Sequence, residues 1–120
     1  MEPYVIKLAE LGMNDVETVG GKNASLGEMI SNLSGLGISV PGGFATTAEA
    51  YRAFLSTDGL GDRIAGILDG LDVDDIDALT SAGQAIRGWI LDTPLPDRLQ
   101  QEIDKAWADM SGGKDIAVAV

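Results

Sequence analysis

The sequence predicts an α+β protein, with several helices around a small sheet, and three observations lead to that class. Much of the chain places apolar residues at the three- and four-residue spacing of amphipathic helices. Short apolar segments near residues 4–8, 43–46 and 116–120 have the character of strands. Hydrophobic residues make up 45% of the chain, which excludes a disordered tail and suffices for a core. At 120 residues, the chain forms at most one domain.

The first part of the chain alternates strand-like and helical segments. Residues 4–11 are short, apolar-rich and partly alternating, which favours an early strand. From residue 23 to residue 33 the apolar side chains recur at helical spacing, and Gly35 and Gly37 are expected to end that helix. A Pro-Gly turn then leads into a second strand near residues 43–46.

Helices are predicted over most of the remaining chain. Thr46 is expected to cap the next helix and Glu49 to complete a capping box. The expected buried face of that helix is formed by Tyr51, Phe54 and Leu55. Helical spacing continues over residues 60–71 and, with Asp74 as the N-cap, over residues 76–90. A last helix is predicted from Pro96, as its first residue, to Ser111.

The final segment, IAVAV at residues 116–120, is an unbroken apolar run typical of a strand buried on both faces. Natural chains rarely stop within such a strand, because its edges and its continuation would remain unpaired. We therefore expect this sequence to be a piece of a longer polypeptide. The exposed strand edges of such a piece favour a homodimer.

Composition excludes several classes of function. The net charge of −11, with eight scattered basic residues, argues against nucleic-acid and anionic-membrane partners. The chain has no cysteine and no histidine, so disulfides, thiolate nucleophiles, Ser–His pairs and the usual zinc sites are excluded. No apolar stretch approaches the roughly 18 to 20 residues that span a bilayer, and the N-terminus lacks the pattern of a signal peptide. We expect a cytoplasmic protein.

Gly20, Gly21 and Lys22 precede a predicted helix and form the one candidate binding site. Glycines let a backbone approach an anion closely, and a helix N-terminus and a lysine both attract one. The P-loop pattern nevertheless fails, because Val16 stands where the first glycine belongs and Asn23 follows the lysine. The residues therefore fit either an anion site or a turn with a solvated lysine.

The acidic run LDGLDVDDID does not fit a calcium loop. Counted from Asp69 or from Asp72, the sixth position lacks the glycine and the twelfth lacks the glutamate of an EF-hand. No pair of carboxylates has a spacing that favours acid–base catalysis. The sequence thus offers no catalytic residue and no metal ligand.

Two longer blocks, VGGKNASLGEMISNL and GISVPGGFATTAEAYRAFL, together with the closing AVAV, closely resemble the N-terminus of the phosphoenolpyruvate synthase (pyruvate, water dikinase) family. The resemblance runs from Tyr4 to the end of the chain and is strongest over residues 19–55. Pyruvate phosphate dikinases and rifamycin phosphotransferases share the scheme in a looser form. This combination of blocks is far more specific than the short patterns tested above.

The resemblance implies that residues 1–120 are the N-terminal fragment of an ATP-grasp-like nucleotide-binding domain. It implies that Lys22 contacts the phosphates of ATP, with Gly20 and Gly21 allowing a close backbone approach. The family converts ATP, pyruvate and water to AMP, phosphoenolpyruvate and phosphate with Mg²⁺, through a phosphohistidine on a mobile domain. That domain, the pyruvate-binding barrel and a family arginine just after the AVAV strand are absent from this sequence, so the fragment is expected to be inactive. The alternatives are a free-standing binding or interaction module, which is a different class, and a relative of the rifamycin phosphotransferases or pyruvate phosphate dikinases.

Overall fold

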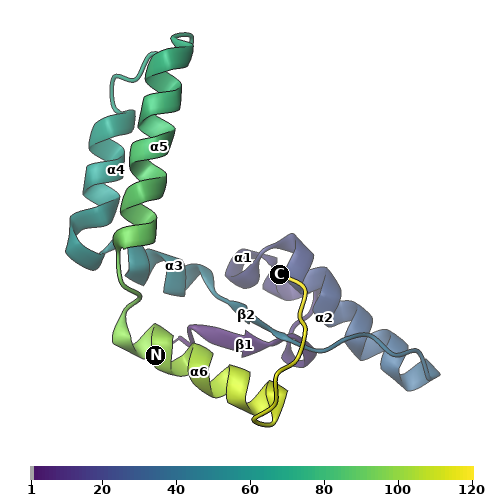
Figure 1. The fold of residues 1–120 in the computed structure, drawn as a ribbon. Helices are drawn as coiled ribbons and strands as arrows, with labels where there is room; N and C mark the ends of the chain where they lie inside the picture. Colours follow the sequence, from purple (N-terminus) through teal and green to yellow (C-terminus); the bar gives the residue numbers. More distant parts are fainter. Residues whose placement is uncertain (1) are drawn as a thin grey trace. The chain divides into compact units, whose positions relative to one another are not determined.

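The computed structural model describes residues 2–120, which form six α-helices, two strands and several short 3₁₀ helices (Figure 1). The predicted class, helices with a small sheet, is confirmed. In chain order the strands and α-helices are β1 (Val5–Lys7), α1 (Val16–Val19), α2 (Gly21–Leu33), β2 (Phe44–Thr46), α3 (Ala48–Leu55), α4 (Leu60–Leu68), α5 (Ile76–Asp92) and α6 (Asp97–Ser111). The 3₁₀ helices are Leu8–Glu10, Met13–Asp15, Ser34–Leu36 and Thr57–Gly59.

The chain divides into two compact units. One comprises the residues up to Tyr51 together with Asp97–Val120, and the other comprises Arg52–Pro96. The first, which we call the sheet unit, contains both strands, and the second, which we call the hairpin unit, is helical.

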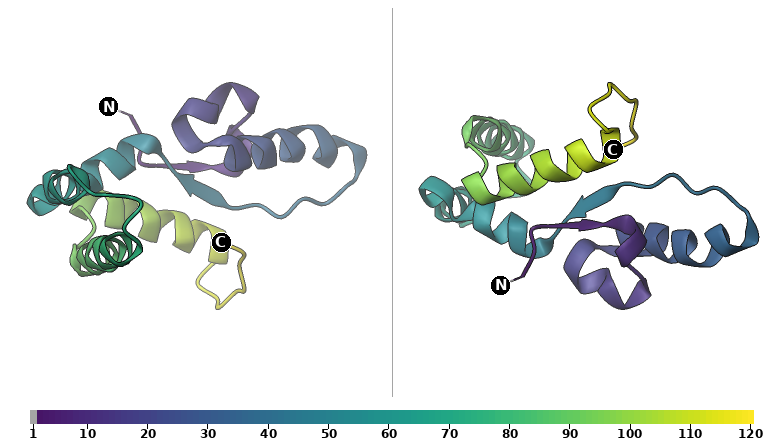
Figure 2. Two further views of the ribbon diagram at one scale, coloured as in Figure 1. Left: turned by 90° about the horizontal axis from the view of Figure 1, so that it is seen from above. Right: turned by 90° about the horizontal axis from the view of Figure 1, so that it is seen from below.

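In the sheet unit, β1 and β2 pair in antiparallel fashion, with Ile6 opposite Ala45. Figure 2 shows this small sheet between α6 on one side and α1 and α2 on the other. The buried side chains that hold these layers together include Leu8, Leu11, Val19, Ala24 and Ala45. Two of the three predicted strand segments are thus confirmed.

The predicted third strand at residues 116–120 is wrong for this structure. These residues have no strand conformation and are exposed, with Val118 at 52% exposure (Figure 1). An apolar run becomes a strand only where a neighbouring strand supplies backbone hydrogen bonds. Among residues 2–120, the sheet consists of β1 and β2 and no described segment pairs with this run.

Helix α2 lies unusually close to the segment that follows β1. A Cβ atom added to Gly27 would lie 2.4 Å from the backbone oxygen of Leu11, so only glycine fits there. Ala24, one turn earlier on the same face, is fully buried. The helix ends near the predicted glycines, where Gly37 adopts a left-handed conformation with φ of 77°.

Two predicted helix caps are displaced by one residue. Thr46 belongs to β2, and the hydroxyl of Thr47 caps α3 by accepting a hydrogen bond from the Ala50 amide at 3.2 Å. Asp75 rather than Asp74 caps α5, accepting from the Ala78 amide at 3.1 Å. In both cases the adjacent residue has a similar side chain, and the path of the backbone decides which oxygen reaches the helix.

The predicted helical segments of residues 60–90 are confirmed as α4 and α5, which lie side by side in the hairpin unit (Figure 1). The Arg63 guanidinium lies over the Trp89 ring at 5.1 Å and joins the two helices. Helix α4 is shorter than predicted, because it ends at Leu68 and the chain turns at Gly70 with φ of 78°.

The strand expected over residues 4–11 ends at Lys7 and is followed by a 3₁₀ helix, and helix α1 was not predicted. The remaining differences from the prediction concern single residues. Tyr51 is 58% exposed and does not belong to the buried face of α3, whereas Phe54 does. Helix α6 begins at Asp97, one residue after the proline that was expected to open it, and ends at Ser111 as predicted.

Candidate functional site

The predicted glycine pair lies where two consecutive helices of the sheet unit meet: Gly20 separates α1 from α2, and Gly21 is the first residue of α2. Gly20 has φ of 87° and ψ of 165°, a conformation that side chains strongly disfavour. Its amide donates to the Val16 carbonyl at 2.8 Å and closes α1, while its carbonyl accepts from Ala24 at 3.1 Å and opens α2. Gly20 is therefore required by the backbone turn itself. Around Gly21 no atom lies within 4 Å of the position of an added Cβ, so the surface in front of it is open.

The N-terminus of α2 has the features of an anion-binding position. No side chain caps it, and the amides of Gly21 and Lys22 precede the first hydrogen bond of the helix. The aligned peptide dipoles of the 13-residue helix place partial positive charge at this end. Free amides and this dipole together attract a phosphate or a carboxylate.

Lys22 is exposed in the first turn of α2. Within residues 2–120, the structure shows no hydrogen bond or ion pair that involves its ammonium group. The structure thus brings Lys22, Gly20 and Gly21 together at one helix end, as the sequence predicted.

The residues that surround Lys22 in the GGKNASLGEM block have structural roles. Asn23 Nδ2 donates to the Val19 carbonyl at 2.9 Å, and Glu28 Oε2 accepts from the Met13 amide at 3.0 Å. Ala24 and Gly27 are buried against the segment after β1. No such role is evident for Lys22, which is the residue of the block with a free charge.

Asn23 and Glu28 were not recognised from the sequence as parts of this arrangement. Their partners, Val19 and Met13, lie in other elements, so no spacing rule within α2 indicates them. The small residues at positions 24 and 27, on one face of a predicted helix, are the one sequence signal of a close approach.

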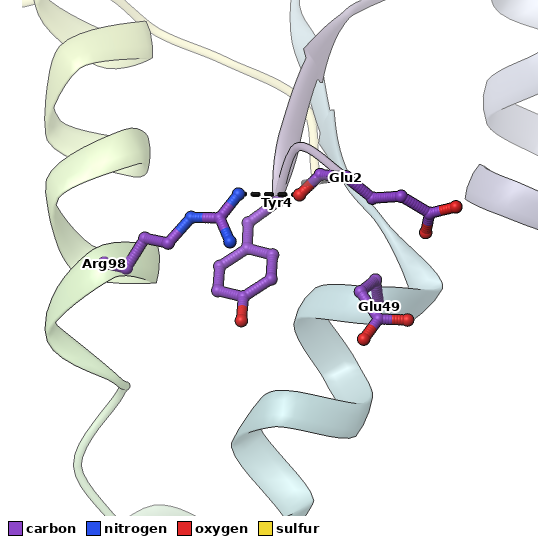
Figure 3. Close-up of a pocket in the computed structure, with 4 residues that line it drawn as sticks. All are labelled: Glu2, Tyr4, Glu49 and Arg98. Carbon is purple, nitrogen blue, oxygen red and sulfur yellow. Dashed lines mark hydrogen bonds between the residues drawn. The ribbon is translucent and has the colours of Figure 1, made fainter.

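A second exposed hollow of the sheet unit, of about 470 Å³, is lined by Glu2, Tyr4, Glu49 and Arg98 (Figure 3). The Arg98 guanidinium stacks on the Tyr4 ring at 3.8 Å and donates to the Glu2 carbonyl at 2.6 Å. Its Nε donates to Glu102 at 2.7 Å. Because this cation is already engaged and two carboxylates line the hollow, the site does not favour an anionic ligand.

Glu102 joins α6 to the start of β1. Its carboxylate accepts from the Tyr4 amide at 3.0 Å as well as from Arg98. Burial raises the pKa of Glu102, but the hydrogen bonds from Tyr4 and Arg98 and the charge of Arg98 outweigh it, so the pKa lies below its ordinary value. This cluster stabilises the fold of the sheet unit.

Within residues 2–120, no group of three or more acidic side chains is placed so that it could hold a metal ion. No helix in this described range has the length and apolar character needed to cross a membrane.

Comparison with known proteins identifies the family of the chain. Residues 16–120 match the family model of the pyruvate phosphate dikinase AMP/ATP-binding domain. The chain belongs to this family. The match begins just before the glycine pair and includes α1, α2 and every later element.

Several curated relatives share the sequence over nearly its whole length. Phosphoenolpyruvate synthase of Pseudomonas aeruginosa is 60% identical over 121 residues, which is 100% of this chain and 15% of the relative. The enzymes of the same name from Neisseria meningitidis and Escherichia coli are 60% and 53% identical, over 98% and 96% of the chain. The chain thus spans about 15% of the length of these relatives. These matches favour the enzyme hypothesis over a free-standing binding module.

Proposed function

We propose that residues 1–120 are the N-terminal part of the ATP-binding domain of a phosphoenolpyruvate synthase, with an ATP-grasp-like fold in the complete domain. In this proposal the complete enzyme converts ATP, pyruvate and water to AMP, phosphoenolpyruvate and phosphate. The observation that carries the proposal is the exposed Lys22 at an uncapped helix N-terminus, in a chain of this ATP-binding family.

The residues present fit the phosphates of ATP. Gly20 and Gly21 leave open surface in front of the first amides of α2, since no atom lies within 4 Å of an added Cβ at either position. Lys22 adds a full positive charge to the partial charge of the helix end. The chain as a whole has a net charge of −11, so this local arrangement must provide the attraction for a polyanion.

The proposal also assigns Mg²⁺ and pyruvate to the complete enzyme as partners. Mg²⁺ accompanies ATP in this class of phosphoryl transfer and neutralises charge on the phosphates. The described residues 2–120 offer no cluster of three acidic ligands, so no residue of this chain is assigned to the metal. Pyruvate and the phosphohistidine belong to further domains of the complete enzyme.

Cellular location and assembly are also part of the proposal. We place the enzyme in the cytoplasm, where ATP and pyruvate are available. We propose that the 120-residue chain forms a homodimer, because β1 and β2 each pair on one side within the described residues, which leaves two strand edges. Sedimentation analysis of the 120-residue chain tests this assembly, and a monomer at all concentrations would contradict it.

The proposal for Lys22 is tested by K22A in the complete enzyme. Formation of the phosphohistidine from ATP should fall about 10- to 100-fold, because a positive charge that positions the phosphates is lost. Formation of the phosphohistidine from phosphoenolpyruvate should remain within about twofold, because that half-reaction does not use ATP. K105A, which removes another exposed lysine, from α6, is the matched control. Equal loss in both half-reactions would show that Lys22 is structural.

The 120-residue chain tested by itself should be inactive and should bind ATP weakly. One lysine and one helix end supply a small part of the electrostatic stabilisation that phosphoryl transfer requires. Calorimetric titration with ATP checks this expectation. A micromolar dissociation constant would contradict it.

A further inference from the structure

We propose that Asn23 is a positioning residue that prepares the helix end beside Lys22 for phosphate. This inference rests on the function proposed above and concerns the same site. Its basis is the hydrogen bond from Asn23 Nδ2 to the Val19 carbonyl, at 2.9 Å.

The bond ties together the two helices that meet at the glycine turn. Val19 is the last residue of α1, and Asn23 lies in the first turn of α2. Between them Gly20 has a positive φ. Two backbone hydrogen bonds fix this conformation: the Gly20 amide donates to the Val16 carbonyl, and the Gly20 carbonyl accepts from the Ala24 amide. The Asn23 side chain adds a bond across the turn, so the orientation of the Gly21 and Lys22 amides is fixed before any ligand arrives.

The bond also changes the electrostatics of the site. Unpaired carbonyl oxygens at the end of a helix carry partial negative charge, and α1 ends directly before the proposed phosphate position. By donating to the Val19 oxygen, Asn23 neutralises part of this charge. Without that donor, the Val19 oxygen would keep its full partial negative charge at the turn that leads to the proposed phosphate position.

Aspartate at position 23 separates this role from helix stability. An acidic residue in the first turn stabilises a helix through its dipole, so N23D does not weaken α2 by that route. Aspartate has the shape of asparagine, but its carboxylate cannot donate to the Val19 carbonyl. It also brings a negative charge next to the bound phosphates.

The experiment is calorimetric titration of the complete enzyme with ATP and, separately, with adenosine, which carries no phosphate. Four variants are compared with the unmodified enzyme. N23A removes the donor without adding a charge, and alanine favours helix. N23D removes the donor and adds a negative charge, and N23S retains a hydroxyl that can donate to the carbonyl four residues earlier. N32A is the matched control, because Asn32 lies in the same helix and its Nδ2 also bonds four residues back, to Glu28 at 3.2 Å.

We expect N23A to weaken ATP binding about fivefold and to leave adenosine binding within about twofold, because the Val19 carbonyl loses its donor and the helix end is less firmly oriented toward the phosphates. N23D should weaken ATP binding further, because it adds a negative charge to the same loss. N23S should retain ATP affinity within about twofold, and N32A should match the unmodified enzyme. Should N23A fail to fold, N23L, which also lacks a donor and adds no charge, carries the same test.

Two results would overturn the inference. One is ATP binding by N23A equal to that of the unmodified enzyme, and the other is an equal loss of ATP and adenosine binding in N23A, which indicates a structural defect. Titration of K22A distinguishes the causes. If K22A weakens ATP binding and N23A does not, the role of Asn23 fails while the proposed function stands. If neither variant weakens it, the phosphate site itself is refuted.

Discussion

The sheet unit and the hairpin unit are stabilised in different ways. In the sheet unit, hydrogen bonds connect residues far apart in the chain. The Tyr4 amide donates to Glu102, and the Thr47 hydroxyl donates to the Pro3 carbonyl. In the hairpin unit, α4 and α5 are neighbours in sequence, and the buried hydrophobic residues are Phe54, Leu60 and Ala82. Long-range contacts fix a backbone more strictly than local ones, and the candidate phosphate site lies in the unit that has them. Four substitutions test this contrast.

The largest effect is expected from L60A in the hairpin unit. Leu60 is fully buried, and its truncation leaves a cavity that costs about 3 to 4 kcal/mol of unfolding free energy. Urea denaturation measures this cost, and L91A is the control, because Leu91 is 84% exposed. Hydrogen exchange should accelerate in α4 and α5 while the amides of α2 stay protected. Equal acceleration in α2 would mean that the two units do not open separately.

A pair of glycine substitutions compares the units directly. G27A in the sheet unit should lower the unfolding free energy by about 2 to 3 kcal/mol, because the new Cβ meets the Leu11 backbone. G66A in the hairpin unit should raise it by up to about 1 kcal/mol, because Gly66 is helical and open and alanine favours helix. Thermal unfolding followed by circular dichroism checks both signs. A harmless G27A would refute the close approach of α2.

The smallest effect is expected from E102Q, which should lower the unfolding free energy by about 1 kcal/mol at neutral pH. Glutamine still accepts a hydrogen bond from the Tyr4 amide but loses the ion pair with Arg98. The pKa of Glu102 is lowered in the folded state, so its ionised form stabilises the fold above the ordinary pKa. This contribution is lost as the pH falls from the ordinary pKa of a glutamate through the lower pKa of the folded state. The difference between the unmodified protein and E102Q should therefore shrink in acid.

Unfolding free energies measured between pH 7 and pH 3 test this trend, with E10Q as a control at an exposed glutamate of the same unit. A difference that stays constant, or grows in acid, would contradict the assigned role of Glu102.

Local patterns predicted the five longer helices and two strands, but not the four-residue α1, because amphipathic spacing and turn residues act within a few residues of one another. They failed by one residue at Thr46 and Asp74, where neighbouring side chains compete for the same cap. They failed fully at residues 116–120, because an apolar run specifies a strand only together with a partner.

The candidate site, like the fold, was predictable from the sequence only in part. The sequence by itself determined that Gly20, Gly21 and Lys22 open a helix, since glycine conformation and helical periodicity are local properties. Only the tertiary structure decided that the Asn23 side chain donates a hydrogen bond to α1 and that Gly27 packs against the Leu11 backbone. It also decided that Arg98 is hydrogen-bonded to Glu102 while Lys22 is exposed. The reason is physical. Which donor meets which acceptor, and which charge remains free, depends on how separate segments pack, and packing is not encoded in any one short stretch.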